Sequence, residues 1–387
     1  MIRCAGVSPG IDSLVLSRYS ALRNKRVALL THPAAIDSSG CSTAQRLHSL
    51  IGSRLVCLFG PEHGFFGNAG PGQQVRSRKH PLWGIPVVSL YGRNRRPTKA
   101  MLQNVDTIVI DLQDIGVRCY TYAATIRYML ETASQCGKCV VVADRPVPLP
   151  RTVDGPSLDS RNECFVAAIP SPMVYGMTPA ETALWICQVC ELNVDLIVMK
   201  MKRYHRNLCR SSNWPPWVPP SPAIVSWESA QCYTATVFCE GVTTIDCGRE
   251  TSIPFQVFGA RWIDGAEVSA TLNALALPGV TFYPHVYTSG NALQPFRGVR
   301  IVVNNPSRFR PVATSVSIIG TLQEMYGKRR VWSDRTRPKF FDALYGSSDV
   351  REALLDGESP GRISGGWKKS IRAFQRDRQE SLLYQTQ

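Results

Sequence analysis

Carboxylates, histidines and arginines directly follow four apolar stretches in the first half of the chain. They lie at residues 31–33, 60–64, 111–118 and 144–146, and each group contains at least one ionisable side chain. These residue types move protons in general acid–base catalysis and hold anionic ligands. One such group would be ordinary turn chemistry, whereas four in succession indicate a shared site. We therefore expect these segments to meet around one cleft that performs acid–base chemistry.

Glu62 is the leading candidate for a general acid. It lies in the sequence FGPEHGFFG, where glycines allow tight turns and two phenylalanines offer apolar walls. A carboxyl group beside aromatic surface has a raised pKa, which suits proton donation near neutral pH. The alternative is a loop glutamate that caps a helix or pairs with an arginine.

Asp114 and Arg118 form a second candidate pair, within the sequence DLQDIGVRCYTY. Asp114 can activate water or stabilise positive charge, and Arg118 can hold a substrate carboxylate through its fork of donors. The alternative is an Asp–Arg pair that only fixes the loop. Tyr120 and Tyr122 follow in the same segment, and their side chains either bind a sugar or pack in the core.

Strands and helices alternate along the segments that must position these residues. The candidate strands are β-branched and almost continuously apolar, which is typical of strands covered on both faces of a sheet. They lie at residues 26–30, 54–59, 85–90, 107–112, 138–143 and 194–199. Helices are expected at residues 42–51, 97–105, 122–135 and 178–192. The pattern predicts a Rossmann-like, doubly wound, mostly parallel α/β sheet, whose ligands bind beyond the carboxyl ends of the strands.

A proline-rich segment at residues 214–223 marks a change of domain. Prolines fix φ and remove backbone donors, so this segment is expected to be a stiff, extended connector. We expect a Rossmann-like N-terminal catalytic domain at residues 1–230 and a smaller α/β domain at residues 231–387. The second domain is expected to open with a strand at 233–239 and to end with an amphipathic helix around 370–383.

The composition narrows the class of protein further. Lys and Arg outnumber Asp and Glu by 44 to 29, which gives a formal net charge of +15. Such a balance attracts anions in general, but the basic residues are dispersed and form no stripe interleaved with aromatic side chains. We therefore expect no nucleic-acid partner. The sequence contains no run of ~18 apolar residues, so no membrane span is expected.

The cysteines and the N-terminal sequence indicate a cytoplasmic location. Thirteen cysteines are scattered without framework spacing, and no export signal is visible, so free thiols in a reducing compartment are expected. A periplasmic or exported location is the alternative if the start is truncated. The pairs Cys136/Cys139 and Cys187/Cys190 lack a fitting ligand loop, and no phosphate loop or HExxH motif occurs. Neither a metal nor an organic cofactor is expected.

Several motifs in fixed order resemble the exo-β-N-acetylmuramidases of peptidoglycan recycling, a family once known only as a domain of unknown function. They are FGPEHGFFG, SLYG, DLQDIGVRCYTY, ADRPVPLP, VDGP, YGMTPAETAL and CEG. The resemblance spans nearly the whole chain. It implies a two-domain fold with its site in the cleft, no cofactor, and hydrolysis of the β-1,4 bond after a non-reducing terminal N-acetylmuramic acid. The implied partner is therefore a peptidoglycan-derived saccharide or muropeptide.

The resemblance also implies roles for particular residues. Glu62 would donate a proton to the glycosidic oxygen. Glycoside cleavage usually needs a second carboxylate, for which Asp114 is our first choice, with Glu240 behind it. The lactyl carboxylate of the sugar requires a cation, for which Arg118, Arg145 and Arg249 are the candidates. The residues expected to line the substrate pocket are His63, Arg118, Tyr120, Tyr122, Asp144, Arg145, Glu240 and Arg249.

Four positions depart from the family pattern. Asp154 stands where the family has a glutamate before Gly-Pro. Val147 replaces an amide, Tyr175 replaces a histidine, and Cys247 takes the place of a carboxylate in the sequence DCGRET. Loss of a carboxylate favours an alternative function, in which the chain binds muropeptides with weak or lost catalysis.

Overall fold

The computed structural model describes residues 6–17, 19–207, 210, 214–290 and 293–384. Its first lobe is built on a seven-stranded sheet in the order β3-β4-β2-β1-β5-β6-β9. All neighbouring strands are parallel except β3, which pairs antiparallel with β4 at one edge. The strands are β1 (Val27–Thr31), β2 (Leu55–Gly60), β3 (Arg78–Lys79), β4 (Pro86–Ser89), β5 (Thr107–Asp111), β6 (Cys139–Ala143) and β9 (Leu196–Met199). The predicted doubly wound, mostly parallel α/β sheet is confirmed.

Helices cover both faces of this sheet. Successive side chains of a strand point to opposite faces, so in β1 Val27 and Leu29 join one apolar cluster while Ala28 and Leu30 join another. On the Val27 side lie α1 (Gly10–Leu16) and α2 (Thr43–Ile51), and on the other side lie α3 (Tyr122–Gln135) and α4 (Pro179–Val189). This two-sided burial explains why the strands are apolar almost without interruption.

Most helix ends follow the sequence signals. The capping box predicted at the start of α4 is present, because Thr178 accepts a hydrogen bond from the backbone of Glu181 and the Glu181 side chain accepts one from the backbone of Thr178. The helix predicted at residues 97–105 is only a 3-10 turn, η3 (Lys99–Leu102). The remaining 3-10 turns are η1 (Ser20–Leu22), η2 (Gly52–Arg54), η4 (Ser160–Asn162), η5 (Val237–Glu240) and η6 (Gln379–Ser381).

The connector at residues 214–223 contains neither helix nor strand, as its prolines predict. The strand predicted at residues 233–239 is wrong, because this segment forms the end of α5 (Trp227–Thr236) and η5. Nearly every residue of α5 is buried, so the helix lacks the polar face that distinguishes a helix from a strand in sequence. Its start signal is Ser226, whose hydroxyl accepts a hydrogen bond from the backbone of Ser229 at 3.0 Å.

The second lobe contains a three-stranded antiparallel sheet, β10-β12-β11, packed against helices. Its elements are β10 (Val257–Ala260), α6 (Gly265–Ala274), β11 (Val280–Tyr287), β12 (Phe296–Val303), α7 (Pro311–Tyr326), α8 (Lys328–Val331), α9 (Pro338–Tyr345), α10 (Asp349–Asp356), α11 (Pro360–Gly366) and α12 (Lys368–Asp377). A short antiparallel pair, β7 (Asp154–Ser157) and β8 (Pro172–Val174), lies between the lobes. The boundary predicted after residue 230 falls inside α5 and stays a prediction.

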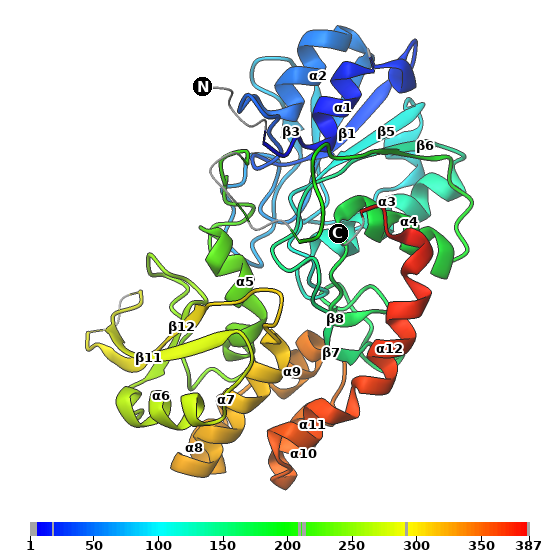
Figure 1. The fold of residues 1–387 in the computed structure, drawn as a ribbon. Helices are drawn as coiled ribbons and strands as arrows, with labels where there is room; N and C mark the ends of the chain where they lie inside the picture. The colour runs from blue at the N-terminus through cyan, green and yellow to red at the C-terminus, as the bar shows by residue number, and fades with distance from the viewer. Residues whose placement is uncertain (1–5, 18, 208–209, 211–213, 291–292, 385–387) are drawn as a thin grey trace, which may run out of the picture.

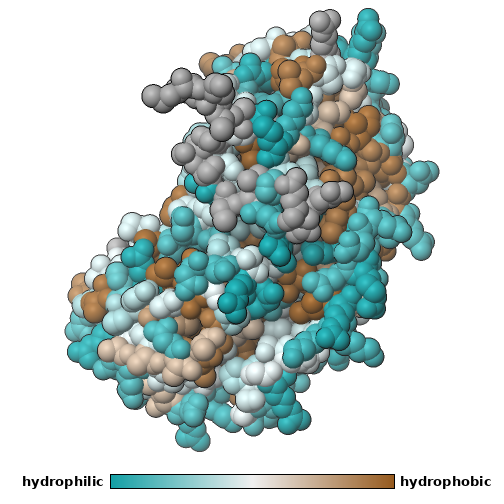
Figure 2. All heavy atoms as spheres, viewed as in Figure 1, coloured by the Kyte–Doolittle hydropathy of each residue, from teal (hydrophilic) through white to brown (hydrophobic). Residues whose placement is uncertain are grey.

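The surface is mixed in character. Hydrophilic residues cover most of the face in view, with an apolar area on the right of the upper lobe (Figure 2). Among the helices of the described ranges, none is both long and apolar enough to cross a membrane.

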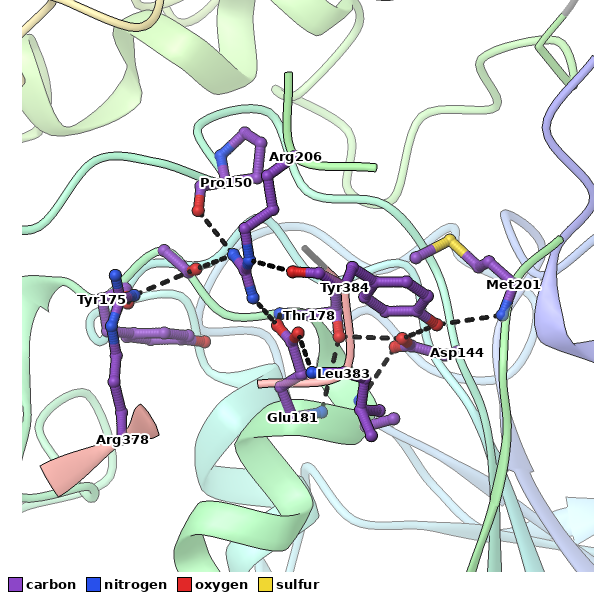
Figure 3. Close-up of polar contacts among 12 residues, drawn as sticks. Asp144, Pro150, Tyr175, Thr178, Glu181, Met201, Arg206, Arg378, Leu383 and Tyr384 are labelled. Carbon is purple, nitrogen blue, oxygen red and sulfur yellow. Dashed lines mark hydrogen bonds and ion pairs between the residues drawn. The ribbon is translucent and has the colours of Figure 1, made fainter. Parts of the chain in front are cut away.

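The end of the chain returns to the first lobe. The C-terminal helices run back from the second lobe, and η6 packs against α4 (Figure 1). There the hydroxyl of Tyr384 donates to Asp144 at 2.6 Å and accepts from the backbone of Met201 at 2.9 Å (Figure 3). Glu181 accepts from the backbone of Leu383 at 2.8 Å. These hydrogen bonds hold the last described residues against the carboxyl end of β6, and we call this set of contacts, made by Leu383 and Tyr384, the C-terminal lock.

Removing the hydroxyl of Tyr384 tests this lock. In Tyr384→Phe the buried amide of Met201 loses its acceptor and Asp144 loses one donor, so the free energy of unfolding should fall by about 1–3 kcal/mol. Thermal or urea unfolding measures this directly. Tyr283→Phe is the matched control, because the side chain of Tyr283 is half exposed and makes no hydrogen bond to a described residue. Equal stability of the two variants would contradict the lock.

Candidate active site

Glu62 lies in a tight loop that begins where β2 ends. The amide of Gly64 donates to the carbonyl of Pro61 at 2.9 Å. Gly60 allows the chain to double back, because a Cβ at this position would lie 2.3 Å from the backbone nitrogen of Phe65. The loop presents a half-buried carboxylate at the carboxyl end of the central strands, where parallel sheets bind ligands.

Two donors from distant segments fix the Glu62 carboxylate. The hydroxyl of Thr121 donates to Oε2 at 2.7 Å, and the amide of Gly72 donates to Oε1 at 3.2 Å. No arginine among the described residues forms an ion pair with Glu62. The carboxylate is therefore positioned by neutral donors, unlike the arginine-paired loop glutamate of the alternative interpretation.

His63, the next residue, stabilises the same loop. Its ring Nδ1 lies 2.8 Å from the carbonyl of Ala69, and its φ of 67° is in the left-handed region. Burial lowers the pKa of His63, although the Ala69 carbonyl and the Glu62 carboxylate oppose this effect. The imidazole is therefore neutral near pH 7 and helps to hold the loop next to Glu62.

Tyr91 approaches Glu62 from the neighbouring strand. In the sheet Gly60 of β2 pairs with Ser89 of β4, and the amide of Leu90 donates to the carbonyl of Gly60 at 2.8 Å. Glu62 and Tyr91 thus follow their paired strands by two residues each. Burial raises the pKa of the Tyr91 phenol, the nearby Glu62 carboxylate raises it further, and Arg95 opposes both.

The second lobe contributes a charged pair to the same region. The guanidinium of Arg249 forms an ion pair with Glu240, and both side chains are partly exposed, at 29% and 24%. The guanidinium carbon lies 5.5 Å from the centroid of the Phe255 ring. Burial raises the pKa of Tyr233, and the charges of Arg249 and Glu62 then act on it in opposite directions. Tyr233 therefore lies within reach of both charges, one from each lobe.

Asp114 is close to this region but lies beneath the surface. It has no exposed surface, its Oδ2 accepts a hydrogen bond from the Tyr175 hydroxyl at 2.6 Å, and its Oδ1 has no partner among the described residues. Burial raises the pKa of Asp114 from 3.8 to about 6. A ligand would have to displace Tyr175 or other covering residues before it touched this carboxyl group.

Tyr120 and Tyr122 form a buried floor. Their ring centroids are 4.7 Å apart, and the hydroxyl of Tyr122 donates to the carbonyl of Pro220 at 2.5 Å and lies 3.2 Å from Nδ1 of His32. Glu62 and Asp114 each add to the rise that burial causes in the pKa of Tyr122. Both carboxylates therefore lie near this floor, but the rings pack in the core and offer little face to a sugar.

Arg118 is buried and has a structural role. Its guanidinium donates to the carbonyls of Pro156, Ser171 and Tyr345, which join the β7–β8 pair to the end of α9. The side chain has no exposed surface, and burial lowers its pKa to about 10. Its donors serve backbone carbonyls, so this geometry gives no support to the predicted contact with a substrate carboxylate.

Asp144 and Arg145 are equally internal. Arg145 forms an ion pair with Asp111 and donates to the carbonyl of Ile36 at 2.8 Å. Asp144 accepts from Thr178, Tyr384 and two backbone amides, as part of the lock shown in Figure 3. The crevice between β1 and β5, where a doubly wound sheet changes direction, is therefore filled by the protein's own polar groups.

Cys247, which takes the place of the family's carboxylate, is buried beside Cys239. Burial raises the pKa of Cys239, and the neighbouring Cys247 thiol adds to the rise. Asp246 accepts a hydrogen bond from the amide of Gly248 at 2.6 Å, so its carboxylate caps its own turn. Glu250 is exposed. Neither flanking carboxylate takes up the buried position of Cys247.

Sequence reasoning missed three residues that surround Glu62. Thr121 lies between the two tyrosines of the DLQDIGVRCYTY motif, directly before α3, and a hydroxyl at a helix start was the available signal. Tyr91 stands in the SLYG motif, directly after the strand predicted at residues 85–90. Tyr233 had no signal, because its segment was interpreted as a strand. Within the described ranges, no group of three metal-ligating side chains lies together.

The fold and this region define a two-lobed α/β protein with a carboxylate-centred site, and comparison with known proteins gives its family. Residues 27–228 match the model of the N-terminal domain of exo-β-N-acetylmuramidase NamZ, and residues 231–384 match that of the C-terminal domain. The chain therefore belongs to the NamZ exo-β-N-acetylmuramidase family, as its motifs predicted.

Individual relatives agree with this assignment. The chain is 36% identical over 382 residues to the peptidoglycan β-N-acetylmuramidase NamZ of Bacillus subtilis, covering 98% of this chain and 91% of that protein. A crystal structure of a DUF1343 family protein from Bacteroides fragilis superposes with a TM-score of 0.91 at 31% identity, covering 98% and 99% of the two chains. A second DUF1343 family structure from the same organism, with a TM-score of 0.76 at 24% identity and coverage of 99% and 100%, shares the fold.

Replacing Asp114 with asparagine tests its buried, proton-binding state. The folded protein holds a proton on Asp114 up to about pH 6 whereas the unfolded chain releases it near pH 3.8, so this group makes stability fall as the pH rises from about 4 to 6. Asp114→Asn should remove this fall and stabilise the protein at pH 7 by roughly 2–3 kcal/mol.

Urea unfolding at pH 4, 5, 6 and 7 measures the effect. Asp334→Asn is the control, because it makes the same change of charge at an exposed side chain. A variant that is destabilised at pH 7 would show that the ionised carboxylate is needed for the fold.

Proposed function

We propose that this protein is an exo-β-N-acetylmuramidase that hydrolyses the β-1,4 bond between a non-reducing terminal N-acetylmuramic acid and N-acetylglucosamine in peptidoglycan fragments. The observation that carries the proposal is the half-buried Glu62, fixed by Thr121 and Gly72 at the carboxyl end of the sheet. A relative named as a peptidoglycan β-N-acetylmuramidase, 36% identical over nearly the whole chain, supports the choice of substrate.

Glu62 acts as the general acid in this proposal. Its proton passes to the glycosidic oxygen while the bond from that oxygen to C1 of the muramic acid breaks, and positive charge develops on the sugar ring. Water then adds to C1 and loses a proton, which yields free N-acetylmuramic acid and the shortened saccharide. Because neutral donors hold Glu62, the carboxyl group can pass through both protonation states without losing an ion pair.

Glu240 is better placed than Asp114 to be the second carboxylate. Asp114, the first choice from sequence, is fully buried and bonded to Tyr175, whereas Glu240 is partly exposed and comes from the facing lobe. Glu240 forms an ion pair with Arg249, and a carboxylate on the lobe opposite the acid suits a base or nucleophile. Asp114 would then support the tyrosine floor instead of touching the substrate.

Arg249 is our choice for the cation that holds the lactyl carboxylate. Of the three arginines considered from sequence, Arg118 and Arg145 serve internal carbonyls and Asp111, while Arg249 is partly exposed. An arginine fork suits a carboxylate because two N–H groups can donate to its two oxygens in parallel.

The proposal includes a peptidoglycan-derived saccharide as partner, no nucleic acid, and a cytoplasmic location. All eleven described cysteines are free thiols, which fits a reducing compartment.

Replacing Glu62 with glutamine tests the role of the acid. We expect kcat/KM for the natural disaccharide to fall about 10²–10⁴-fold, the range of general acid catalysis. A nitrophenyl muramide has a leaving group that needs little protonation. The fall in kcat/KM for this substrate should therefore be at least tenfold smaller. Release of sugar or chromophore measures both reactions.

The control is Glu267→Gln, an exposed residue of α6, which should leave both rates unchanged. Equal losses for the two substrates would contradict the acid role and point to a nucleophile at Glu62. Full activity of Glu62→Gln on the disaccharide would remove Glu62 from the mechanism.

A second substitution tests the anchor for the lactyl group. Arg249→Gln should raise KM for the disaccharide about tenfold, because one charge-assisted contact of about 1.4 kcal/mol is lost. When the lactyl carboxylate is converted to an amide, the wild type and the variant should have the same KM. A larger loss on the amide than on the acid would instead assign Arg249 to positioning Glu240.

The alternative function is binding of muropeptides with weak or lost catalysis, and the buried Cys247 is the observation that favours it. It predicts calorimetric binding of the disaccharide without product after long incubation. Release of N-acetylmuramic acid, abolished in Glu62→Gln, would exclude it.

A further inference from the structure

A basic groove lies beside the candidate site, formed by the segment that follows Tyr91. It is open to solvent, with a volume of about 670 Å³, and its walls are residues 93–99 on one side and α3 with Phe165 on the other. Arg93, Arg95 and Lys99 are exposed and form no ion pair or hydrogen bond with a described residue. The remaining arginine, Arg96, is paired with Glu131. The groove therefore presents three unneutralised cations.

Aromatic rings fix the central cation. The guanidinium carbon of Arg95 lies 4.7 Å from the centroid of Phe165 and 5.3 Å from that of Tyr91. Such stacking orients the planar guanidinium and leaves its N–H groups free to donate at its edge. Arg96 covers Tyr128 in the same way, at 4.1 Å. The groove is therefore preorganised for carboxylates, and its aromatic faces are already covered by guanidinium groups.

Tyr91 relates the groove to the surroundings of Glu62. The charges of Glu62 and Arg95 both act on the Tyr91 phenol, and the guanidinium carbon of Arg95 lies 5.3 Å from the Tyr91 ring. Strands β2 and β4 leave the sheet side by side, with Gly60 paired to Ser89. The amide of Val75 donates to the carbonyl of Tyr91 at 2.8 Å, and a Cβ on Gly92 would lie 2.7 Å from the carbonyl of Val75. The backbone between the site and the groove is therefore fixed, so the spacing from Glu62 to Arg95 is built into the fold.

We infer that this groove binds the part of a peptidoglycan glycan strand that extends beyond the scissile bond, with Arg95 and Arg93 holding the lactyl carboxylate of the next muramic acid. The inference rests on the proposed function and adds a preference for saccharides longer than two sugars. Muramic acid recurs at every second sugar, so a strand held at Glu62 carries its next carboxylate into the groove. A single-stranded nucleic acid fits less well, because its bases need free aromatic faces on which to stack.

The experiment measures binding in a Glu62→Gln background, so that ligands stay intact. The probes are a disaccharide and a tetrasaccharide of alternating muramic acid and N-acetylglucosamine, both without peptide and with muramic acid at the non-reducing end. We expect the tetrasaccharide to bind about tenfold more tightly at low salt, a difference that shrinks as salt is added. Adding Arg93→Gln and Arg95→Gln should lower tetrasaccharide affinity to that of the disaccharide and leave disaccharide affinity within twofold.

The matched control carries Lys369→Gln and Arg372→Gln, two exposed residues of α12 that make the same change of net charge. It should keep the preference for the tetrasaccharide. The inference is overturned by equal affinity for the two saccharides, by equal losses for both in the groove variant, or by a DNA oligonucleotide that binds as tightly as the tetrasaccharide. Absence of hydrolysis in the wild type with the length preference intact would overturn the proposed function alone.

Discussion

Parallel pairing of β2 with β1 on one side and β4 on the other holds the loop that carries Glu62. The amide of Leu90 bonds to the carbonyl of Gly60, so the segments after the two strands leave the sheet at the same level. A slip of one residue in this register would turn every side chain of β2 to the opposite face. The two-sided core prevents such a slip, because both faces of β2 are buried under helices.

The interior beneath this edge contains several buried charged groups, which are held by ion pairs or by hydrogen bonds. Arg145 is bound to Asp111, Arg206 is bound to Glu181, and Arg118 is surrounded by backbone carbonyls. Removing one partner from a buried pair costs about 3–5 kcal/mol, since the other charge remains without compensation. These groups therefore specify how the connecting loops, the β7–β8 pair and the C-terminal segment come together.

In this arrangement, the residues that position the site differ from those that can contact a substrate. Tyr120, Tyr122 and Asp114 are buried, and Thr121, between the two tyrosines, donates the hydrogen bond that holds Glu62. The groups with accessible polar atoms come from three different places: the loop after β2, the segment after β4, and the second lobe with Glu240 and Arg249. Buried residues thus hold the partly exposed catalytic groups in place, so that the substrate can adapt to them.

The sequence by itself determined the sheet, most helices, the family and the position of Glu62 at a strand end. Continuous β-branched stretches and capping boxes are local signals, because they depend only on residues that are close together in the sequence. It did not determine α5, whose buried surface on all sides removes the periodicity of an amphipathic helix.

Only the tertiary structure decided which charged residues remain accessible. Arg118 and Arg249 look alike in sequence, but the first donates to the carbonyl of Tyr345, 227 residues away, and the second stays at the surface. Thr121 and Tyr91 meet Glu62 for the same reason, through strand pairing and helix placement. A guanidinium or carboxylate takes its role from the partners that folding brings to it, and those partners are distant in the chain.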